Sequence, residues 1–391
     1  MKYNVILAAA FAIAAFPASV AAADKLAAAR EIINEVKSQM APDSRQVVAE
    51  ISASRLPSGA IVLRGATSEA GVRAEAIRRM AAAGIDIADS ITVYPTDRWA
   101  QVRLSAASLR TRGAHAGEMA TQALMGTPLR VLQSGGDWWR VQTPDGYIAY
   151  IPSSSVVEKT PAQMRAWRGA KRFIVTSLDQ VKAYNSPTAT GPRDVVTDLV
   201  NGCIVTIPEG RPNIVNRRYH IELPDGREAY VDTSALKNID QWAAQTFNPE
   251  LILDVAYSLE GTPYLWGGTS TKAVDCSGLA KTAYFANGII LMRDASQQAL
   301  TGTRIEAENW RDCRAGDLLF FGTRAGKVTH VAIYDSNGDY VHSSGRVKRN
   351  SVDPTNPSYL TTPFLHSVRI GGNEGTRGIT RAAEHPWYYN L

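Results

Sequence analysis

Val274-Asp275-Cys276-Ser277-Gly278-Leu279 is the stretch that decides the fold, because it sets a cysteine where a turn gives way to a helix. The turn lies just before it, in the glycine-rich segment Gly261–Gly268 (GTPYLWGG), and the apolar and small residues up to Phe285 predict the helix. Unpaired N–H groups and the positive end of the helix dipole stabilise a thiolate at such a place. We therefore expect Cys276 to have a lowered thiol pKa and to act as a nucleophile.

Two histidines further along the chain supply the partners that a thiol nucleophile needs. His330 lies in the strand-like segment Lys327–Tyr334, and His342 ends the segment Asp339–His342. A cysteine followed by a histidine and then by a second polar side chain is the order typical of a thiol with its base. We interpret His330 as the general base and His342 as the group that orients it.

The segment from about residue 248 to the C-terminus resembles the NlpC-type family of cell-wall cysteine peptidases. The matched motifs occur in family order and are Tyr264–Gly268, Asp275–Gly278, Arg314–Phe321, His330–Tyr334 and Val341–His342. The resemblance implies a papain-like α+β domain over residues 248–391, no cofactor, and hydrolysis of bonds next to D-glutamate in peptidoglycan stem peptides. It also implies that Cys276 is the nucleophile, His330 the base and His342 the third member. The Tyr264 hydroxyl would join the Cys276 N–H in binding the oxyanion.

The other cysteines and histidines have no such motif around them. Cys203 lies in a strand-like run and is interpreted as a small buried hydrophobe. Cys313 has charged neighbours but no motif that gives it a role. The histidines that we interpret as surface or packing residues are His115, His220, His366 and His385. No pair of these groups has a C-x-x-C or H-x-x-x-H spacing, so no metal site is predicted.

The chain begins with a segment typical of a secretory signal peptide. Lys2 precedes an apolar run from Val5 to Phe16, and Ala21-Ala22-Ala23 ends the segment before Asp24. We expect residues 1–23 to be cleaved off, the alternative being an uncleaved anchor, for which the run is short. This predicts export to the periplasm, or release outside the cell, without stable membrane insertion.

The composition excludes some function classes. The formal net charge is +5, and removing residues 1–23 takes away Lys2 and no acid, which leaves 41 basic against 37 acidic side chains, or +4. Without a basic tract or a recognised motif, nucleic-acid binding is not indicated. The three cysteines lie far apart, so we expect no disulfide framework and a monomer stabilised by several apolar cores.

The middle of the chain contains an internal repeat. Trp138–Ile151 matches Tyr219–Val231, and each copy reads as a strand, a Pro-Asp-Gly turn and a second strand. Short strands with tight turns, in units of this size, suggest two small barrels over residues 100–160 and 170–242. They resemble the bacterial SH3-like domains that accompany NlpC-type peptidases.

The repeat helps to separate structural from functional residues. Tyr150 and Tyr230 occupy equivalent places, so Tyr150 is interpreted as a packing residue, whereas Tyr147 has Arg227 as its counterpart. In peptidases of this architecture the first barrel offers an acid and a tyrosine to a free substrate amine. Glu118 and Tyr147 resemble that pair.

A buried ammonium group needs carboxylates and other hydrogen-bond acceptors to offset its desolvation. Asp275, beside the nucleophile, could be a second carboxylate that binds the substrate's ammonium group. Ser296 resembles a substrate-contacting serine of the family, with an ordinary helix cap as the alternative. We also place Ser277 and Trp266 in the substrate-binding set because they lie within the matched motifs.

Residues 24–99 lie outside the peptidase resemblance. A helix is predicted over Lys25–Met40, and a ββαβ order follows, with strands at 47–53, 60–63 and 89–94 and a helix over 68–83. This small α+β module resembles periplasmic BON-type modules, which more often bind or dock than catalyse.

Together these features predict an exported multidomain α+β cysteine peptidase. It would cut the bond between γ-D-glutamate and a diamino acid in stem peptides whose N-terminal L-Ala is free. The alternatives are hydrolysis of another cell-wall amide and a catalytically inert wall-binding protein. The sequence leaves open which diamino acid is accepted.

Overall fold

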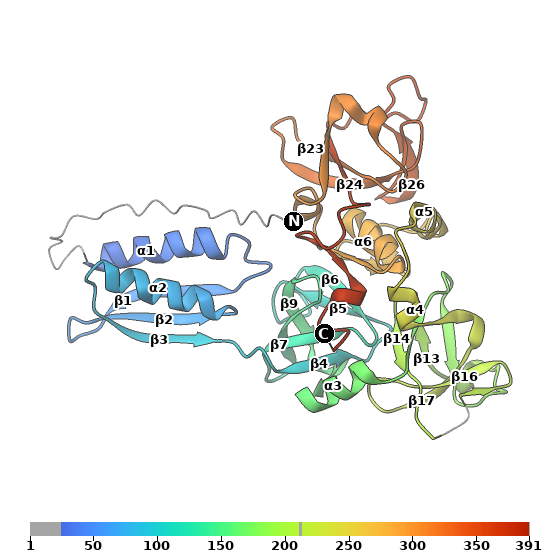
Figure 1. Ribbon diagram of the computed structural model, residues 1–391, viewed down its shortest axis with the longest axis horizontal. Helices are drawn as coiled ribbons and strands as arrows, with labels where there is room; N and C mark the ends of the chain where they lie inside the picture. The colour runs from blue at the N-terminus through green and yellow to red at the C-terminus, as the bar shows by residue number, and fades with distance from the viewer. Residues whose placement is uncertain (1–24, 211–212, 391) are drawn as a thin grey trace, which may run out of the picture. The chain divides into compact units, whose positions relative to one another are not determined.

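The structure is a computed structural model that describes residues 25–210 and 213–390. The predicted signal peptide, residues 1–23, lies outside the described residues. The chain divides after Tyr94 into two compact units (Figure 1). Within the described ranges, no helix has the length and apolar character needed to cross a membrane.

The first unit is a three-stranded sheet with two helices packed on it (Figure 1). Its elements are α1 (Lys25–Met40), β1 (Ala49–Arg55), β2 (Ile61–Thr67), α2 (Ala70–Ala82) and β3 (Ile87–Val93). β1 runs antiparallel to β2, whereas β2 and β3 are parallel, so α2 serves as the crossover that parallel strands require. Apolar side chains at helical spacing on α1 (Ile32, Ile33, Val36) join those of the strands in one core. The predicted ββαβ order is confirmed.

The second unit starts with a seven-stranded antiparallel sheet. Its strands are β4 (Trp99–Val102), β5 (Ala106–Arg110), β6 (Met119–Leu124), β7 (Pro128–Gln133), β8 (Trp138–Gln142), β9 (Ile148–Pro152) and β10 (Val156–Lys159). They are ordered β10-β4-β7-β8-β9-β5-β6. Helix α3 (Pro161–Gly169) follows, and Thr160 and Gln163 form a capping box at its start.

A second antiparallel sheet follows α3. Its strands are β11 (Arg172–Val175), β12 (Val181–Tyr184), β13 (Val195–Leu199), β14 (Ile204–Thr206), β15 (Ile214–Val215), β16 (Arg218–Glu222), β17 (Glu228–Asp232) and β18 (Leu236–Asn238). The order is β13-β12-β17-β16-β14-β11-β18, with β15 beside β16. Among the described strands, neither this sheet nor the preceding one closes on itself. The two regions therefore have the expected SH3-like architecture, as small sheets that stay open.

Both copies of the sequence repeat form the predicted hairpins, β8–β9 and β16–β17. Each Pro-Asp-Gly turn holds its glycine at a positive φ, +84° at Gly146 and +82° at Gly226, a region that glycine enters without strain. Tyr150 lies under the guanidinium of the cross-strand Arg140. Tyr230 stacks in the same way on its cross-strand neighbour in the second hairpin. Tyr150 is thus a packing residue, as predicted.

The last part of the second unit is a six-stranded antiparallel sheet with helices packed on it. The helices packed on it are α5 (Pro249–Ser258), α6 (Cys276–Ala286) and α7 (Ala295–Gln298), whereas α4 (Ile239–Ala243), just before them, contacts β11 and β18 of the preceding sheet. The sheet is ordered β22-β27-β23-β24-β25-β26, from β22 (Thr303–Glu306), β23 (Leu318–Gly322), β24 (Val328–Tyr334), β25 (Asp339–Ser344), β26 (Arg346–Ser351) and β27 (Phe364–Arg369). This part of the unit also contains two separate two-stranded sheets. One pairs β19 (Thr269–Ser270) with β20 (Ala273–Val274), and the other pairs β21 (Ile289–Leu291) with β28 (Ile379–Arg381).

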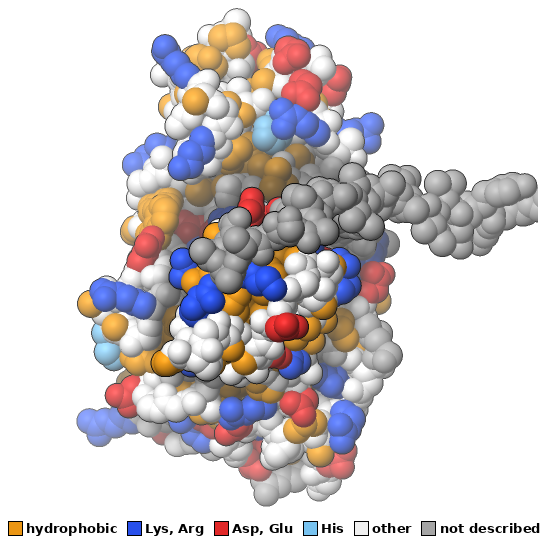
Figure 2. Space-filling model, turned by 90° about the vertical axis from the view of Figure 1, so that its left-hand side faces the viewer, with side chains coloured by type: hydrophobic (Ala, Val, Ile, Leu, Met, Phe, Trp, Pro, Cys, Tyr) orange, Lys and Arg blue, Asp and Glu red, His pale blue; other side chains and the backbone are white. Residues whose placement is uncertain are grey.

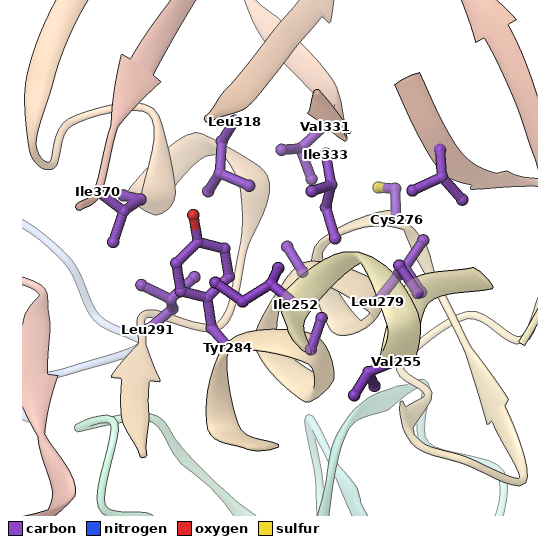
Figure 3. Close-up of a cluster of buried hydrophobic side chains, with 14 of the residues drawn as sticks. Ile252, Val255, Cys276, Leu279, Tyr284, Leu291, Leu318, Val331, Ile333 and Ile370 are labelled. Atoms are coloured by element: carbon purple, nitrogen blue, oxygen red, sulfur yellow. The ribbon is translucent and has the colours of Figure 1, made fainter. Parts of the chain in front are cut away.

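An apolar core joins α5 and α6 to this sheet. Leu279 and Tyr284 of α6 belong to one buried cluster with Val331 and Ile333 of β24, and Cys276 lies at the margin of the same cluster (Figure 3). Burial of this cluster fixes the helix that carries the cysteine against the strand that carries His330.

The surface carries charge of both signs. On the face drawn in Figure 2, Lys and Arg side chains are interspersed with Asp and Glu side chains. This mixture agrees with the small net charge of +5.

Candidate active site

The nucleophile is placed by the cap of helix α6. Asp275 is the N-cap residue, and its carboxylate accepts hydrogen bonds from the N–H groups of Gly278 (2.7 Å) and Gly267 (2.9 Å). A Cβ atom on Gly278 would lie 1.8 Å from the carbonyl oxygen of Gly268, so the first turn of the helix can approach this loop only with glycine there. Cys276, the first residue of the helix, is 8% exposed.

A buried arginine, Arg293, holds the Asp275 cap in place. Its Nη2 lies 2.5 Å from Oδ2 of Asp275, and its Nη1 lies 3.2 Å from Oδ1 and 2.9 Å from the hydroxyl of Ser277. Both carboxylate oxygens therefore have donors already, and the charge of Asp275 is neutralised. The predicted contact of Asp275 with a substrate amine is untested, and the arrangement gives Asp275 a structural task.

The resting thiol is neutral. Burial raises the pKa of Cys276 to about 11, and the charge of Asp275 adds to the shift, while the backbone N–H groups of Val331 and Ser277 oppose it. The predicted lowering of this pKa is therefore wrong for the resting site, because desolvation of a thiolate outweighs the helix terminus.

The two histidines form a hydrogen-bonded pair. Nε2 of His330 lies 2.8 Å from Nδ1 of His342, and Nε2 of His342 lies 2.9 Å from Oδ1 of Asn350. Burial lowers the pKa of His330 to about 3, helped by His342 and Lys348. Burial also lowers the pKa of His342 to about 4. Both rings are neutral at physiological pH, so His330 can accept a proton.

Tyr264 lies at the same site. Its N–H donates to the carbonyl oxygen of Gly345 (3.0 Å), and its backbone bridges to Val274, just before the cap. Burial, with the nearby Cys276 and Asp275, raises the pKa of Tyr264 above its ordinary value. The phenol stays protonated and can donate a hydrogen bond to a developing oxyanion.

The first SH3-like sheet docks directly on the loop before the nucleophile. Gln122 of β6 exchanges hydrogen bonds of 3.0 and 3.1 Å with Thr269. A Cβ atom on Gly267 would lie 2.6 Å from the carbonyl oxygen of Met119, the residue after Glu118. The start of β6, and with it Glu118, therefore lies against the Trp266–Gly267 turn.

The candidate amine-binding residues differ in their surroundings. Glu118 is exposed, and its carboxylate has no hydrogen bond or ion pair with any described residue. Tyr147 is 8% exposed and interacts electrostatically with Arg293, which places it near the cap of α6. Trp266 is 60% exposed, and Ser296, in the first turn of α7, is also exposed.

The remaining cysteines lie in other surroundings. Cys203 is fully buried, its thiol donates to the carbonyl oxygen of Ser105 (3.3 Å), and burial raises its pKa to about 12. Cys313 lies 3.2 Å from the hydroxyl of Ser367. Among the described residues, no group of His, Cys, Asp and Glu is arranged to hold a metal ion.

Sequence reasoning missed Arg293 and Asn350. Arg293 lies three residues before Ser296, but nothing in the sequence pairs it with Asp275. Asn350 faces Tyr340 across the β25–β26 pair, two positions along from the pair of His342 and Lys348 and so on the same face of the hairpin. The alternation of His342, Lys348 and Asn350 could have suggested one common face, but only with the hairpin register known.

Acidification should destabilise the second unit steeply. The folded pKa values of about 3 (His330) and about 4 (His342) lie below the ordinary 6.5, so below about pH 6.5 the unfolded chain binds protons that the folded chain does not. The free energy of unfolding then falls by about 1.4 kcal/mol per pH unit for each histidine until its folded pKa is reached.

This prediction is measured by urea unfolding between pH 7 and pH 5, followed by Trp fluorescence, since all eight Trp residues lie after Tyr94. The double variant His330→Gln, His342→Gln should have a flatter dependence on pH. If the free energy of unfolding of the double variant fell as steeply with pH as that of the wild type, the lowered pKa values assigned to His330 and His342 would be contradicted.

A cysteine at a helix N-terminus, packed against an antiparallel sheet that carries a histidine pair, defines a papain-like cysteine hydrolase. The model of the NlpC/P60 family matches residues 261–369. A gamma-D-glutamyl-L-lysine dipeptidyl-peptidase of Bacillus subtilis is 44% identical over 230 residues, which are 57% of this chain and 71% of that protein. The chain therefore belongs to the NlpC/P60 family of cell-wall peptidases, and it is a cysteine peptidase.

Further comparisons extend the similarity to the SH3-like part. The model described as "Bacterial dipeptidyl-peptidase Sh3 domain" matches residues 109–156. A gamma-D-glutamyl-L-lysine dipeptidyl-peptidase of Bacillus cereus is 27% identical over 280 residues, covering 68% of this chain and 80% of that protein. The crystal structure of an NlpC/P60 family protein from Bacillus cereus covers 69% of this chain and 99% of its own, with a TM-score of 0.58 and 21% identity, and so shares the fold.

Proposed function

We propose that this protein is exported and hydrolyses the bond between γ-D-glutamate and a diamino acid in peptidoglycan stem peptides with a free N-terminal L-Ala. The proposal assigns catalysis to residues 248–391 and amine recognition to the first SH3-like domain, residues 100–160. The proposal gives no part in catalysis to the second SH3-like domain (170–242) or to the N-terminal module (24–99). The relatives named gamma-D-glutamyl-L-lysine dipeptidyl-peptidase support the choice of bond.

The proposed specificity for substrates with a free N-terminal amine rests on one observation. The first SH3-like sheet packs on the turn before the nucleophile through Gln122 and Met119, next to Glu118. An exposed carboxylate without a partner, together with Tyr147 near the cap of α6, suits a peptide ammonium group. The substrate would then extend from that ammonium, through L-Ala and D-Glu, to Cys276.

Acylation begins with proton transfer from the thiol to its base. The Cys276 thiol gives its proton to Nδ1 of His330, which makes no hydrogen bond with any described residue, and the sulfur attacks the γ-carbonyl carbon of D-glutamate. The oxyanion is stabilised by the Tyr264 hydroxyl and by the Cys276 N–H. His330 then protonates the departing amine of the diamino acid, and a γ-glutamyl thioester remains.

Deacylation reverses the proton transfers. Water gives a proton to His330 as its oxygen attacks the thioester, and the C–S bond breaks. The Cys276 sulfur leaves as a thiolate and takes the proton back from His330. The products are L-Ala-D-Glu and the diamino acid, with whatever residue follows it.

The test is mass spectrometry of products from the tripeptide L-Ala-γ-D-Glu-diamino acid and from its N-acetylated form. We expect L-Ala-D-Glu from the free tripeptide and a loss of kcat/KM of about 100-fold or more on acetylation, because the acetylated amine has no charge to pair with the Glu118 carboxylate and leaves the polar groups of the site without their partner. Glu118→Gln and Tyr147→Phe should reduce this discrimination.

Two matched variants serve as controls for those substitutions. Asp137→Asn removes an exposed acid from the turn between β7 and β8 of the same domain, and Tyr150→Phe removes the hydroxyl of a packing tyrosine. Both should keep the discrimination. Equal rates on free and acetylated peptides would contradict amine recognition, and no cleavage of either would favour another wall amide or a binding protein.

A further inference from the structure

Asn350 has a fixed amide orientation beside the histidine pair. Its Nδ2 donates to the carbonyl oxygen of Ser358 (2.8 Å), and its Oδ1 lies 2.9 Å from Nε2 of His342. A rotated amide would place two acceptors together at Ser358 and would lose that bond. The oxygen of Asn350 therefore faces His342.

The orientation of Asn350 determines which nitrogen of His342 carries the proton. An amide oxygen only accepts hydrogen bonds, so Nε2 of His342 must be the protonated nitrogen. In a neutral ring, Nδ1 is then an acceptor, and it lies 2.8 Å from Nε2 of His330. Nε2 of His330 must donate this bond, which leaves the lone pair of His330 on Nδ1.

We propose that Asn350 is a positioning residue that sets the tautomers of both histidines and so presents the basic Nδ1 of His330 to the Cys276 thiol. The chain of hydrogen bonds runs from Ser358 through Asn350 and His342 to His330. This inference adds a fourth member to the cysteine and histidine set and rests on the catalytic roles in the proposed function.

A positive charge near the two histidines explains why His342 benefits from the hydrogen bond to Asn350. Lys348 faces His342 across β25–β26, and its ammonium group disfavours a positive charge on either ring. The oxygen of Asn350 is the group that opposes this effect at His342, because its hydrogen bond favours the protonated ring. Without Asn350, His342 could protonate on Nδ1, and Nε2 of His330 would then have to accept instead of donate.

The first readout needs no substrate. Long-range proton–nitrogen NMR of the histidine-labelled full chain reports the tautomer of each neutral imidazole, and both His330 and His342 should carry their proton on Nε2. A proton on Nδ1 of either ring in the wild-type protein would overturn the proposal, whatever bond the enzyme cuts.

The second readout uses variants. In Asn350→Leu, which keeps the approximate shape but cannot accept, we expect mixed tautomers, a kcat lower by about 10- to 100-fold and an unchanged KM. The rate at which iodoacetamide alkylates Cys276, measured by peptide mass spectrometry, should fall by the same factor as kcat. Asn350→Asp keeps an acceptor and should restore the Nε2 tautomer and most of both rates.

Asn373→Leu is the matched control, because Asn373 follows another strand of the same sheet, β27, and its Nδ2 also donates to a carbonyl oxygen, that of Arg369 (3.1 Å), without meeting a histidine. It should leave tautomers, kcat and alkylation unchanged. If Asn350→Leu fails to fold, the tautomers measured by NMR in the wild type and in Asn350→Asp still test the proposal. Wild-type tautomers and rates in a folded Asn350→Leu would contradict the proposal. Should the tripeptide not be cleaved, the proposed function fails alone, while NMR and alkylation still test Asn350.

Discussion

The Cys276→Ala variant should lose cleavage of the tripeptide by at least about 10⁴-fold and keep its fold. The loss is large because no other described side chain at the site can form the acyl-enzyme, while Tyr264 and the backbone N–H leave only weak stabilisation of the oxyanion. We expect the substitution to change the free energy of unfolding little, since the thiol lies at the margin of the apolar cluster. Product formation is measured by mass spectrometry, and the fold by circular dichroism.

Cys313→Ala is the control for this prediction. Cys313 and Cys276 are each 8% exposed, but Cys313 bonds to Ser367 and lies in a different apolar cluster. We expect unchanged kcat and a loss of stability of about 1 kcal/mol from the missing contact. Turnover by folded Cys276→Ala, or an equal loss in Cys313→Ala, would show that Cys276 is not the nucleophile.

Local motifs allowed the central residues to be predicted. Cys276 was expected at a helix start because a glycine-rich turn precedes an apolar run, and α6 begins at that residue. The paired histidines lie on neighbouring strands, β24 and β25, where alternating patterns indicated strands. The repeat also predicted both hairpins, since a Pro-Asp-Gly turn requires its glycine.

Features that depend on distant parts of the chain could not be predicted. The pKa of Cys276 follows from burial against β24, which no nearby residue reveals. Arg293 meets Asp275 only through the turn that follows α6. Asn350 reaches His342 through a register that the hairpin geometry decides. The motif therefore identifies the reacting groups, whereas the tertiary structure sets their charge and orientation.

Gly278→Ala should have the largest effect on stability of any single methyl group added near the site. Its Cβ would lie 1.8 Å from the carbonyl oxygen of Gly268 and 3.0 Å from Oδ1 of Asp275. A backbone carbonyl cannot rotate away as a flexible side chain can, so helix α6 must move or its cap must open. We expect a loss of at least about 3 kcal/mol in the free energy of unfolding.

Gly169→Ala provides the matched control, because Gly169 ends helix α3 in the same unit and its Cβ would meet only Asn390, at 3.9 Å. Alanine should be neutral there or stabilising by up to about 1 kcal/mol. Both variants are compared by urea unfolding with Trp fluorescence. Any folded Gly278→Ala should also lose about 100-fold in kcat for each ångström by which the thiol moves. Equal stability of the two variants would mean that α6 does not pack on the Gly268 loop as closely as the site requires.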